Sequence, residues 1–437
     1  MTDVRQVVHE LLAQLGSSRE AQQYLKEYSG TNQARFAVVK VGGGVLRDHL
    51  DELTSALAFL HRLGLIPVVL HGAGPQLDQA LADAGIETER REGLRVTSEA
   101  VMSVARPLMY KENLRLVEAL ESRGIHARSI QHGVFGCSYL DKENLGLVGE
   151  VEEVELSAVE SAVRSGAMPV LTCLGESHSG QVLNINADIA TRELVWALRP
   201  HKVIFLSPTG GLLDGQDRII SAVSLTNDYD ALMQESWVHS GMRLKLQQIN
   251  DMLQELPDST SVSITSAANL TRELFTYRGA GTLVRKGEAI NVYEKTDPAT
   301  LETVMKLVEK SFGKSLRAGW FECLDNPLVL LSETGRAAAI ITVGVDGLPY
   351  LDKFIVTSEA QGEGLGAAIW QVVRARFPAL YWRSRNTNPV TPWYFQQADS
   401  SNRQGQWVIF TLGVSDARQR ERCVADAFIR DSGWVDE

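Results

Sequence analysis

Apolar residues recur along this chain in two alternating patterns, short continuous runs and longer stretches with helical spacing. The runs Phe36–Val41 and Leu65–Leu70 predict buried strands, and glycines follow each of them. Further apolar runs stand at 168–171 and 203–206, and helical spacing is found at 48–63, 98–122, 187–198 and 241–256. Strands that alternate with helices form parallel sheets covered on both faces. We therefore expect an α/β fold with a mostly parallel sheet.

The pattern changes toward both ends of the chain. Residues 1–28 carry apolar positions at helical spacing and predict a helical arm before the first domain, which we place at 29–286. Polar residues make 287–297 a candidate linker to a second domain at 298–437. There the runs 328–332, 337–343 and 348–356 predict consecutive antiparallel strands, followed by a helix at 365–377 and a strand at 380–383. The second domain is therefore expected to be α+β.

Composition and charge narrow the class of protein. A chain of 437 residues with 44% hydrophobic and 22% charged residues is typical of a folded protein with two or three domains. Its net charge of -11 argues against a nucleic-acid partner. Without a signal-like start or a long apolar stretch, we expect a cytoplasmic protein with no membrane contact. The cysteines are far apart and form no CxxC pair, so we expect neither disulfides nor a bound metal.

Two glycine-rich segments at opposite ends of the chain are candidate phosphate sites. Gly42-Gly43-Gly44 follows the first strand and Lys40, and Gln361-Gly362-Glu363-Gly364-Leu365-Gly366 opens a predicted helix. Glycine lets a backbone approach an anion closely, and a helix start favours negative charge. A second turn, Gly72-Ala73-Gly74, ends the next strand, where parallel sheets bind ligands. Plain tight turns are the alternative for each segment. The pattern predicts two phosphate-bearing cosubstrates in two domains.

Residues of about 36–285 resemble the amino acid kinase family, and within it the N-acetylglutamate kinases. The resemblance rests on the glycine turns and on Gly93-Leu94-Arg95-Val96-Thr97, Asn184-Ile185-Asn186-Ala187-Asp188 and Gly241-Met242-Arg243-Leu244-Lys245. It implies a three-layer αβα sandwich that binds ATP with Mg²⁺. In the family pattern two lysines neutralise the transferring phosphoryl group and an aspartate organises them. The implied residues are Lys40, Lys245 and Asp188 for catalysis, Gly42, Gly43 and Gly44 for ATP, and Gly72, Ala73, Gly74, Arg95 and Asn184 for N-acetylglutamate.

The chain departs from this family pattern at two places. Ala73 replaces the usual third glycine of its turn, which only narrows the turn. Ser207-Pro208-Thr209 replaces the usual threonine–aspartate pair after a strand, and this removes a carboxylate from the nucleotide side.

The second glycine segment resembles the coenzyme A cradle of the Gcn5-related N-acetyltransferases. Residues 350–354 and 382–395 extend the likeness to the acetyltransferase domain of N-acetylglutamate synthases that carry an amino acid kinase domain. This implies that Gln361, Gly362, Gly364, Leu365 and Gly366 hold acetyl-CoA. The family pattern further implies that Lys353 and Arg383 anchor L-glutamate, that Asn388 orients the reacting groups, and that Tyr394 is the proton donor. The alternatives without a role in catalysis or binding are a packing aromatic at Tyr394 and a solvated lysine at Lys353.

Together the resemblances imply two steps of arginine biosynthesis, synthesis of N-acetylglutamate and its phosphorylation. One alternative is a synthase whose kinase fold only senses arginine, and another is a non-enzymatic sensor. The joint presence of Lys40, Asp188 and Lys245 favours a retained kinase. The arm resembles the helix with which arginine-sensitive kinases build oligomers, so we expect a homo-oligomer, with a tetramer as our guess; an amphipathic cap is the alternative. Glu273, Gly279 and Gly281 resemble a segment that binds L-arginine as an inhibitor.

Overall fold

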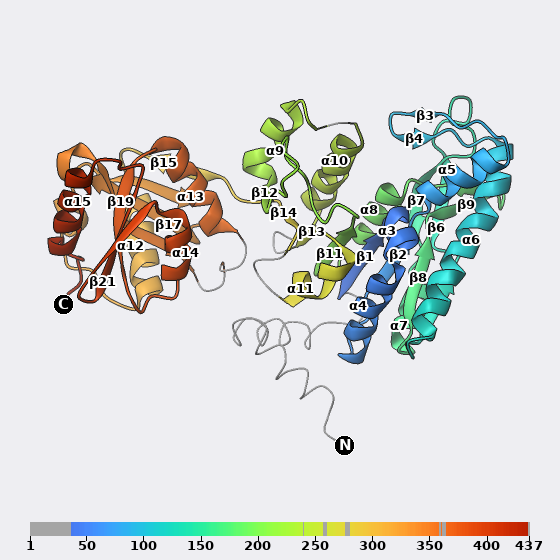
Figure 1. The fold of residues 1–437 in the computed structure, drawn as a ribbon, viewed down its shortest axis with the longest axis horizontal. Coiled ribbons are helices and arrows are strands. Elements are labelled where there is room, and N and C mark those ends of the chain that lie inside the picture. Colours follow the sequence, from blue (N-terminus) through green and yellow to red (C-terminus); the bar gives the residue numbers. More distant parts are fainter. Residues whose placement is uncertain are drawn as a thin grey trace, which may run out of the picture. The chain divides into compact units, whose positions relative to one another are not determined.

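A computed structural model of the chain describes residues 36–238, 240–256, 260–275, 280–357, 360 and 364–435. The predicted arm at 1–28 lies outside these residues, as do Gly279, Gln361 and Gly362. The chain divides into two units, one that ends at Lys286 and one that begins at Gly287 (Figure 1). Each unit has a sheet and a core of its own.

The first unit is built on an eight-stranded sheet. Every neighbouring pair of strands in it is parallel except β13 and β14. In sheet order the strands are β12 (Ala222–Ser224), β14 (Thr282–Arg285), β13 (Ser261–Thr265), β11 (Lys202–Leu206), β1 (Ala37–Val41), β2 (Val68–His71), β8 (Met168–Thr172) and β5 (Ala127–Ile130). The prediction of a mostly parallel sheet is confirmed.

Helices cover both faces of this sheet, because successive side chains of a buried strand point to opposite faces. On β1, Val38 packs into a cluster with α8 and α10, and Val39 into a cluster with α4 and α11. The sandwich of three layers is therefore confirmed. The helices are α3 (Gly43–Asp48), α4 (Leu50–Arg62), α5 (Gly74–Asp83), α6 (Glu99–Glu121), α7 (Ser157–Arg164), α8 (Ala187–Leu198), α9 (Leu225–Gln234), α10 (Ser240–Gln254) and α11 (Leu270–Phe275), with the short η2 (Ala267–Asn269) before α11.

Two small sheets complete the first unit. The four-stranded one runs β10 (Val182–Asn184), β9 (Leu174–Ser177), β6 (Phe135–Tyr139) and β7 (Gly149–Val154). The two-stranded one pairs β3 (Arg90–Arg91) with β4 (Leu94–Arg95). These sheets carry Asn184 and Arg95, two of the predicted substrate residues.

The second unit has a seven-stranded sheet in which only β18 and β19 run parallel. The three antiparallel strands predicted from the sequence are present as β16, β17 and β18. The strands are β15 (Ile290–Tyr293), β16 (Leu328–Ser332), β17 (Ala337–Val343), β18 (Pro349–Val356), β19 (Leu380–Arg385), β21 (Trp407–Leu412) and β20 (Ser400–Gln404). Strand β15 lies within 287–297, the segment that we predicted to be a linker, and pairs with β16.

Each face of this second sheet carries two helices. Clusters of buried residues place α12 (Pro298–Phe312) and α15 (Ala417–Ile429) on one face, and α13 (Leu365–Arg376) and α14 (Thr391–Gln397) on the other. The Asp297 carboxylate caps α12 by accepting hydrogen bonds from the Ala299 and Thr300 amides. Short helical turns η3 (Phe321–Cys323) and η4 (Val345–Gly347) complete the unit.

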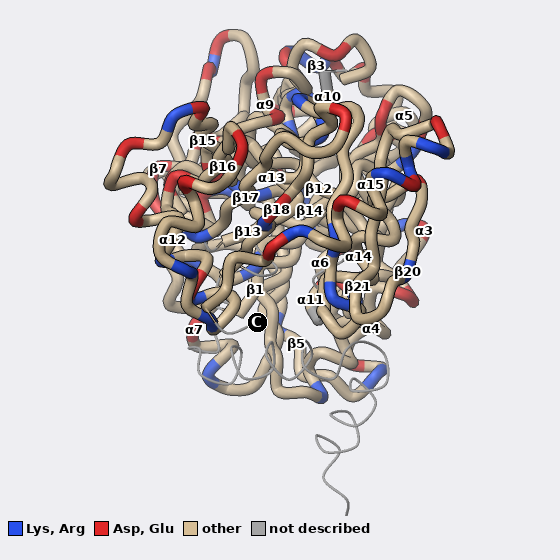
Figure 2. The backbone as a smooth tube through the Cα atoms, turned by 90° about the vertical axis from the view of Figure 1, so that its left-hand side faces the viewer, with Lys and Arg blue, Asp and Glu red and all other residues tan. Residues whose placement is uncertain are grey.

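Charged residues of both signs are interspersed along the backbone (Figure 2). Among the helices that the structure describes, none has the length and apolar character needed to cross a membrane.

Candidate functional site

A cavity of about 270 Å³ lies at the carboxyl ends of β1 and β2 in the first unit. Parallel sheets commonly bind ligands at this edge. The cavity collects most of the kinase residues predicted from the sequence: Lys40, Gly42, Gly43, Gly72, Ala73, Gly74, Arg95, Asn184 and Asp188. Residues that the sequence analysis did not single out, among them Arg90, Met109 and Cys173, also line it. Residues from distant parts of the chain therefore meet in one polar cavity.

Lys40 and Asp188 form an ion pair at the centre of this cavity. Lys40 Nζ lies 2.6 Å from Asp188 Oδ1, with 12% and 17% of the two side chains exposed. Burial opposes the charged form of Asp188, but the charges of Lys40 and Lys245 outweigh it and lower the carboxyl pKa. Asp188 is therefore a carboxylate at neutral pH.

Lys245 belongs to the same charge cluster. Burial lowers the pKa of Lys245, the positive charge of Lys40 lowers it further, and Asp188 opposes both effects. Asp188 thus shares its negative charge between two ammonium groups, which leaves a net positive charge in the cluster. Such a cluster attracts an additional anion.

Local structure positions these groups. Asp188 stands in the first turn of α8, whose N-cap Asn186 accepts hydrogen bonds from the Asp188 and Ile189 amides. Asn184 Nδ2 donates to Thr97 Oγ1 over 3.1 Å. The Arg95 guanidinium, of which 7% is exposed, is paired with Asp78. Arg95 and Asn184 are therefore held at the cavity wall by contacts within the protein.

The departure at Ser207-Pro208-Thr209 lies beside the first glycine turn. A Cβ on Gly44 would lie 3.1 Å from Pro208 Cγ, so the proline ring packs against the turn. The hydroxyls of Ser207 and Thr209 are 2.9 Å apart and bond to each other. This segment therefore carries hydroxyl groups at the place where the family pattern described above has a carboxylate.

His71 ends β2 directly before the second glycine turn and is fully buried. Its Nε2 lies 3.2 Å from Asn113 Nδ2, which also donates to the Val170 carbonyl oxygen. Burial lowers the pKa of His71 to about 4, because the imidazolium would be charged in an apolar interior.

This pKa predicts a pH-dependent stability. The unfolded chain takes up a proton on His71 near pH 6.5, whereas the folded chain stays neutral down to about pH 4. Stability is therefore full above pH 6.5 and is lost as the pH falls through this window, by on the order of 3 kcal/mol. We expect urea unfolding of the His71→Gln variant to depend less on pH between these limits. The exposed control His178→Gln should keep the slope of the wild-type protein, and an unchanged slope in His71→Gln would exclude His71 as the source.

In the second unit, the described part of the glycine cradle begins at Gly364. This residue caps α13 with a φ of 85°, in the left-handed region that favours glycine. A Cβ on Gly366 would lie 3.2 Å from Val356 Cγ2, so the start of α13 packs closely on the end of β18. Leu365 is buried between them. Gln361 and Gly362 lie outside the described residues.

Tyr394 lies in an aromatic cluster between α13, α14 and the sheet. Its ring centroid is 5.5 Å from that of Trp382, 5.6 Å from Phe410 and 5.4 Å from Trp393. Burial raises the pKa of the Tyr394 phenol above its ordinary value, so the group keeps its proton at neutral pH. Both interpretations of Tyr394, proton donor and packing aromatic, are compatible with this position.

Lys353 faces the opposite side of the sheet from Tyr394. Its neighbour Phe354 contacts the Tyr394 ring, and successive strand residues alternate between faces. Lys353 Nζ lies 4.5 Å from the centroid of Trp320 and 5.5 Å from that of Trp434, and it is paired with Asp352. The alternative interpretation of Lys353, a solvated lysine, is wrong, because two tryptophans cover this side chain.

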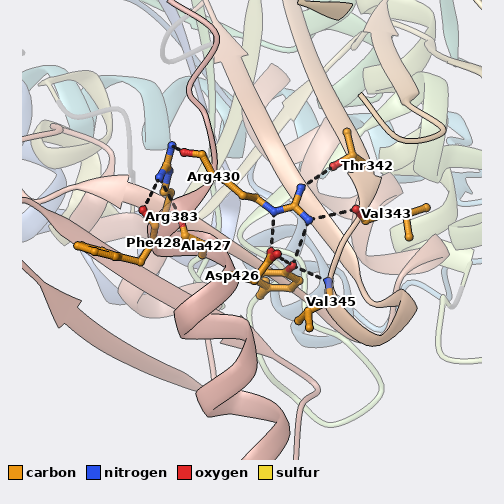
Figure 3. A network of polar contacts seen from close by, with 9 residues as sticks. Thr342, Val343, Val345, Arg383, Asp426, Ala427, Phe428 and Arg430 are labelled. Atoms are coloured by element: carbon orange, nitrogen blue, oxygen red, sulfur yellow. Dashed lines mark hydrogen bonds and ion pairs between the residues drawn. The ribbon is translucent and has the colours of Figure 1, made fainter. Parts of the chain in front are cut away.

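Arg383 is held by the C-terminal segment (Figure 3). Its guanidinium donates to the carbonyl oxygens of Ala427 and Arg430 over 2.8 and 2.6 Å, and lies over the Trp407 ring. Arg430 bonds in turn to Asp426 on α15. Asn388 Oδ1 accepts from the Val390 amide in the turn before α14. The structure thus joins Arg383 to α15 and to the segment that follows it.

The parallel strands β18 and β19 are paired at only two positions, Tyr350 with Tyr381 and Leu351 with Trp382. On β18, Lys353 stands two residues after the last paired position, and on β19, Arg383 stands one residue after it.

A second cavity, of about 500 Å³, lies between α12 and the β16–β17 turn. Lys306, Lys310 and Arg336 line it, together with Thr303 and Thr357. The sequence analysis missed these cations. The available signal was the spacing of Lys306 and Lys310, which puts both on one helix face beside the buried Leu307. Lys306 is paired with Glu302 and Arg336 with Glu288, so much of this positive charge is balanced within the protein.

The predicted arginine segment is only partly described. Glu273 is buried, and its carboxylate accepts a hydrogen bond from the Ala280 amide over 2.9 Å. A Cβ on Gly281 would lie 2.0 Å from the Ile264 carbonyl oxygen, which makes this glycine a packing requirement of the fold. Gly279 lies outside the described residues.

Comparisons with known proteins assign each of the two units to a known protein family. The model of the amino acid kinase family matches residues 35–266, and the model of the N-acetyltransferase of N-acetylglutamate synthase matches residues 291–429. Acetylglutamate kinase of Xanthomonas campestris is 47% identical over 95% of this chain and 99% of its own length. The human mitochondrial N-acetylglutamate synthase is 32% identical over 97% of this chain and 78% of its own.

A solved structure supports the fold. The crystal structure of N-acetylglutamate synthase from Neisseria gonorrhoeae, complexed with coenzyme A and N-acetyl-glutamate, covers 90% of this chain and 98% of its own, with a TM-score of 0.63 and 18% identity. The predicted fusion of two domain types is therefore confirmed. The chain belongs to the amino acid kinase family, and it joins to the kinase domain an N-acetyltransferase domain of the N-acetylglutamate synthase type.

Proposed function

We propose that this chain catalyses two consecutive steps of arginine biosynthesis. The second unit transfers an acetyl group from acetyl-CoA to L-glutamate, and the first unit uses ATP to phosphorylate the N-acetylglutamate that results. The observation that carries the kinase assignment is the charge cluster of Lys40, Asp188 and Lys245 at a cavity between two glycine turns.

The kinase step brings two anions together, the side-chain carboxylate of N-acetylglutamate and the γ-phosphoryl group of ATP. Catalysis therefore depends on positioning and positive charge. Lys40 and Lys245 stabilise the charge that develops on the transferring group, and Asp188 holds both side chains in place by attracting them. Arg95 and Asn184 hold the acceptor, beside Gly72, Ala73 and Gly74, and Gly42, Gly43 and Gly44 face ATP.

Magnesium enters with the nucleotide. Mg²⁺ prefers oxygen ligands and is commonly bound through substrate phosphates. The acidic residue that lines the described cavity, Asp188, is already paired with Lys40. The residues therefore fit an ion carried mainly by the phosphates of ATP, where it neutralises their charge.

The acetyl-transfer step needs a deprotonated amine and a proton for the departing thiolate. Gly364, Leu365 and Gly366, with Gln361 and Gly362, bind the pyrophosphate of acetyl-CoA. Tyr394 supplies the proton to the thiolate, and Asn388 orients the reacting groups. Lys353 on β18 and Arg383 on β19 anchor glutamate.

The two activities belong to separable domains, with the boundary between Lys286 and Gly287. Each unit has its own sheet and its own buried clusters, which supports independent folding. Because β15 pairs with β16, a fragment that begins at Gly287 should be better folded than one that begins at Pro298. We expect the longer fragment to unfold cooperatively on heating and to bind acetyl-CoA. Noncooperative unfolding of both fragments would contradict separability.

The proposal includes inhibition by L-arginine, which binds near Glu273, Gly279 and Gly281. It also includes assembly into a homo-oligomer through the arm at 1–28. A cytoplasmic location fits the same account. An effect of arginine on either rate, measured with varied substrate, tests the regulatory part.

A synthase with a purely sensory kinase fold is the second candidate, favoured by the hydroxyls at Ser207 and Thr209. ATP-dependent acyl phosphate formation, trapped as the hydroxamate with N-acetylglutamate supplied, separates the two. We expect hydroxamate only when ATP, Mg²⁺ and N-acetylglutamate are all present. Its absence, with acetyl transfer intact, would favour the sensor.

A further inference from the structure

The two glycine turns of the kinase cavity touch each other. A Cβ on Gly43 would lie 2.9 Å from the backbone nitrogen of Gly74 and 2.8 Å from Pro75 Cδ. The backbones of the two turns are therefore in direct contact. In the proposed kinase reaction one turn faces ATP and the other faces N-acetylglutamate, so this contact sets how far apart the two substrates are held.

One side chain ties the turns together. Gln76 stands in the first turn of α5, two residues after Gly74, and its Nε2 donates to the Gly43 carbonyl oxygen in the first glycine turn over 2.9 Å. Because a peptide unit is planar, holding this carbonyl also fixes the direction of the Gly44 N–H. Gln76 is not among the residues that line the cavity. It can act on the reaction only through the turns.

A charged pair on α6 supports this side chain. Glu112, which is 6% exposed, accepts from Gln76 Nε2 over 3.3 Å and from Arg115 Nη2 over 2.8 Å. Arg115 Nη2 also donates to the Leu46 carbonyl oxygen over 2.7 Å. The long helix α6 thus fastens both α3 and the amide of Gln76.

The unbonded half of the Gln76 amide is informative. Its Oε1 is buried and has no hydrogen-bond partner among the residues that the structure describes. A buried polar atom without a partner costs free energy, so a side chain selected only for stability would not carry it. The useful part of Gln76 is its NH₂ group, which holds the first turn.

We propose that Gln76, supported by Glu112 and Arg115, is a positioning residue that fixes the spacing of the two glycine turns for phosphoryl transfer. The proposal rests on the proposed kinase function. A misplacement of about 1 Å between reacting groups can cost roughly a hundredfold in rate. Loss of the Gln76 hydrogen bond should therefore lower kcat while substrate binding at each turn persists.

Gln76→Met tests this in the full-length protein, since methionine has a similar size but donates no hydrogen bond. We expect kcat of the kinase to fall by about ten- to a hundredfold, with both KM values changed less than about threefold and acetyl transfer unchanged. The matched control is Gln79→Met on the exposed side of the same helix, where Gln79 bonds only to Asp83. It should keep the wild-type kcat.

A double-mutant cycle with Glu112→Gln tests the supporting role. If Glu112 acts through Gln76, the losses in kcat are less than additive. Wild-type kcat in Gln76→Met, or a loss matched by a fall in melting temperature and in acetyl transfer, would overturn the proposal. If the wild-type protein shows no kinase turnover, both the proposed function and the positioning role are contradicted. If the wild-type protein turns over and Gln76→Met has the same kcat, only the positioning role is contradicted.

Discussion

Replacement of Lys245 or Lys40 by alanine should reduce acyl phosphate formation by about a thousandfold or more, because each substitution removes a positive charge from the phosphoryl transition state. The loss should appear mainly in kcat. Lys40→Ala also leaves Asp188 without its ion-pair partner at 2.6 Å, so we expect this variant to be the less stable of the two. Acetyl transfer should stay within about twofold of the wild-type rate, since these lysines belong to the other domain.

Lys142→Ala is the control for a lost positive charge. Lys142 is exposed and lies over the Tyr139 ring, outside the cavity lining. It should leave both activities unchanged. Retained kinase turnover in Lys245→Ala would show that the charge cluster does not act on the transferring group, and the kinase assignment would then lose its main support.

Tyr394→Phe should lower the acetyl-transfer rate by roughly a hundredfold or more, the usual contribution of a general acid. Phenylalanine preserves the packing against Trp382 and Phe410 and removes only the hydroxyl. Acetyl-CoA affinity and kinase turnover should therefore be retained. The measurement is thiol release with saturating glutamate, with acetyl-CoA binding measured by calorimetry on the same sample.

Tyr293→Phe, which removes a hydroxyl from β15 in the same unit, is the matched control and should keep the wild-type rate. Full activity of Tyr394→Phe across the pH range would leave Tyr394 as a packing aromatic. The proton would then have to come from water or another group.

The sequence predicted those features of the fold that depend on local pattern. Phe36–Val41 is apolar except for Lys40 and is followed by glycines, and it supplies a central strand of the mostly parallel sheet. Ser98 and Asp297 accept hydrogen bonds at the starts of α6 and α12, where polar caps are expected. The strand β15 was missed because its four residues stand between polar segments, and only pairing with β16 makes them a strand.

The candidate kinase site was predictable because its motifs lie at strand ends and helix starts that a parallel sheet brings to one edge. The hydrogen bonds from Gln76 to Gly43 and Glu112 were not predictable, since the spacing of these residues along the chain does not indicate a contact. Lys353 was predicted without its tryptophan cover for the same reason: Trp320 and Trp434 come from distant segments. Contacts between distant segments depend on packing, which no local pattern records.

The central claim is that one chain performs both steps, and a single reaction tests it most directly. Purified protein is supplied with L-glutamate, acetyl-CoA, ATP and Mg²⁺, without added N-acetylglutamate. Thiol release is read in one portion, and hydroxylamine, which itself cleaves thioesters, is added only to a second portion to trap any acyl phosphate. The account predicts that thiol release and N-acetylglutamyl hydroxamate both appear, and that omitting acetyl-CoA abolishes both. Thiol release without hydroxamate, in a sample that also fails to use added N-acetylglutamate, would contradict it.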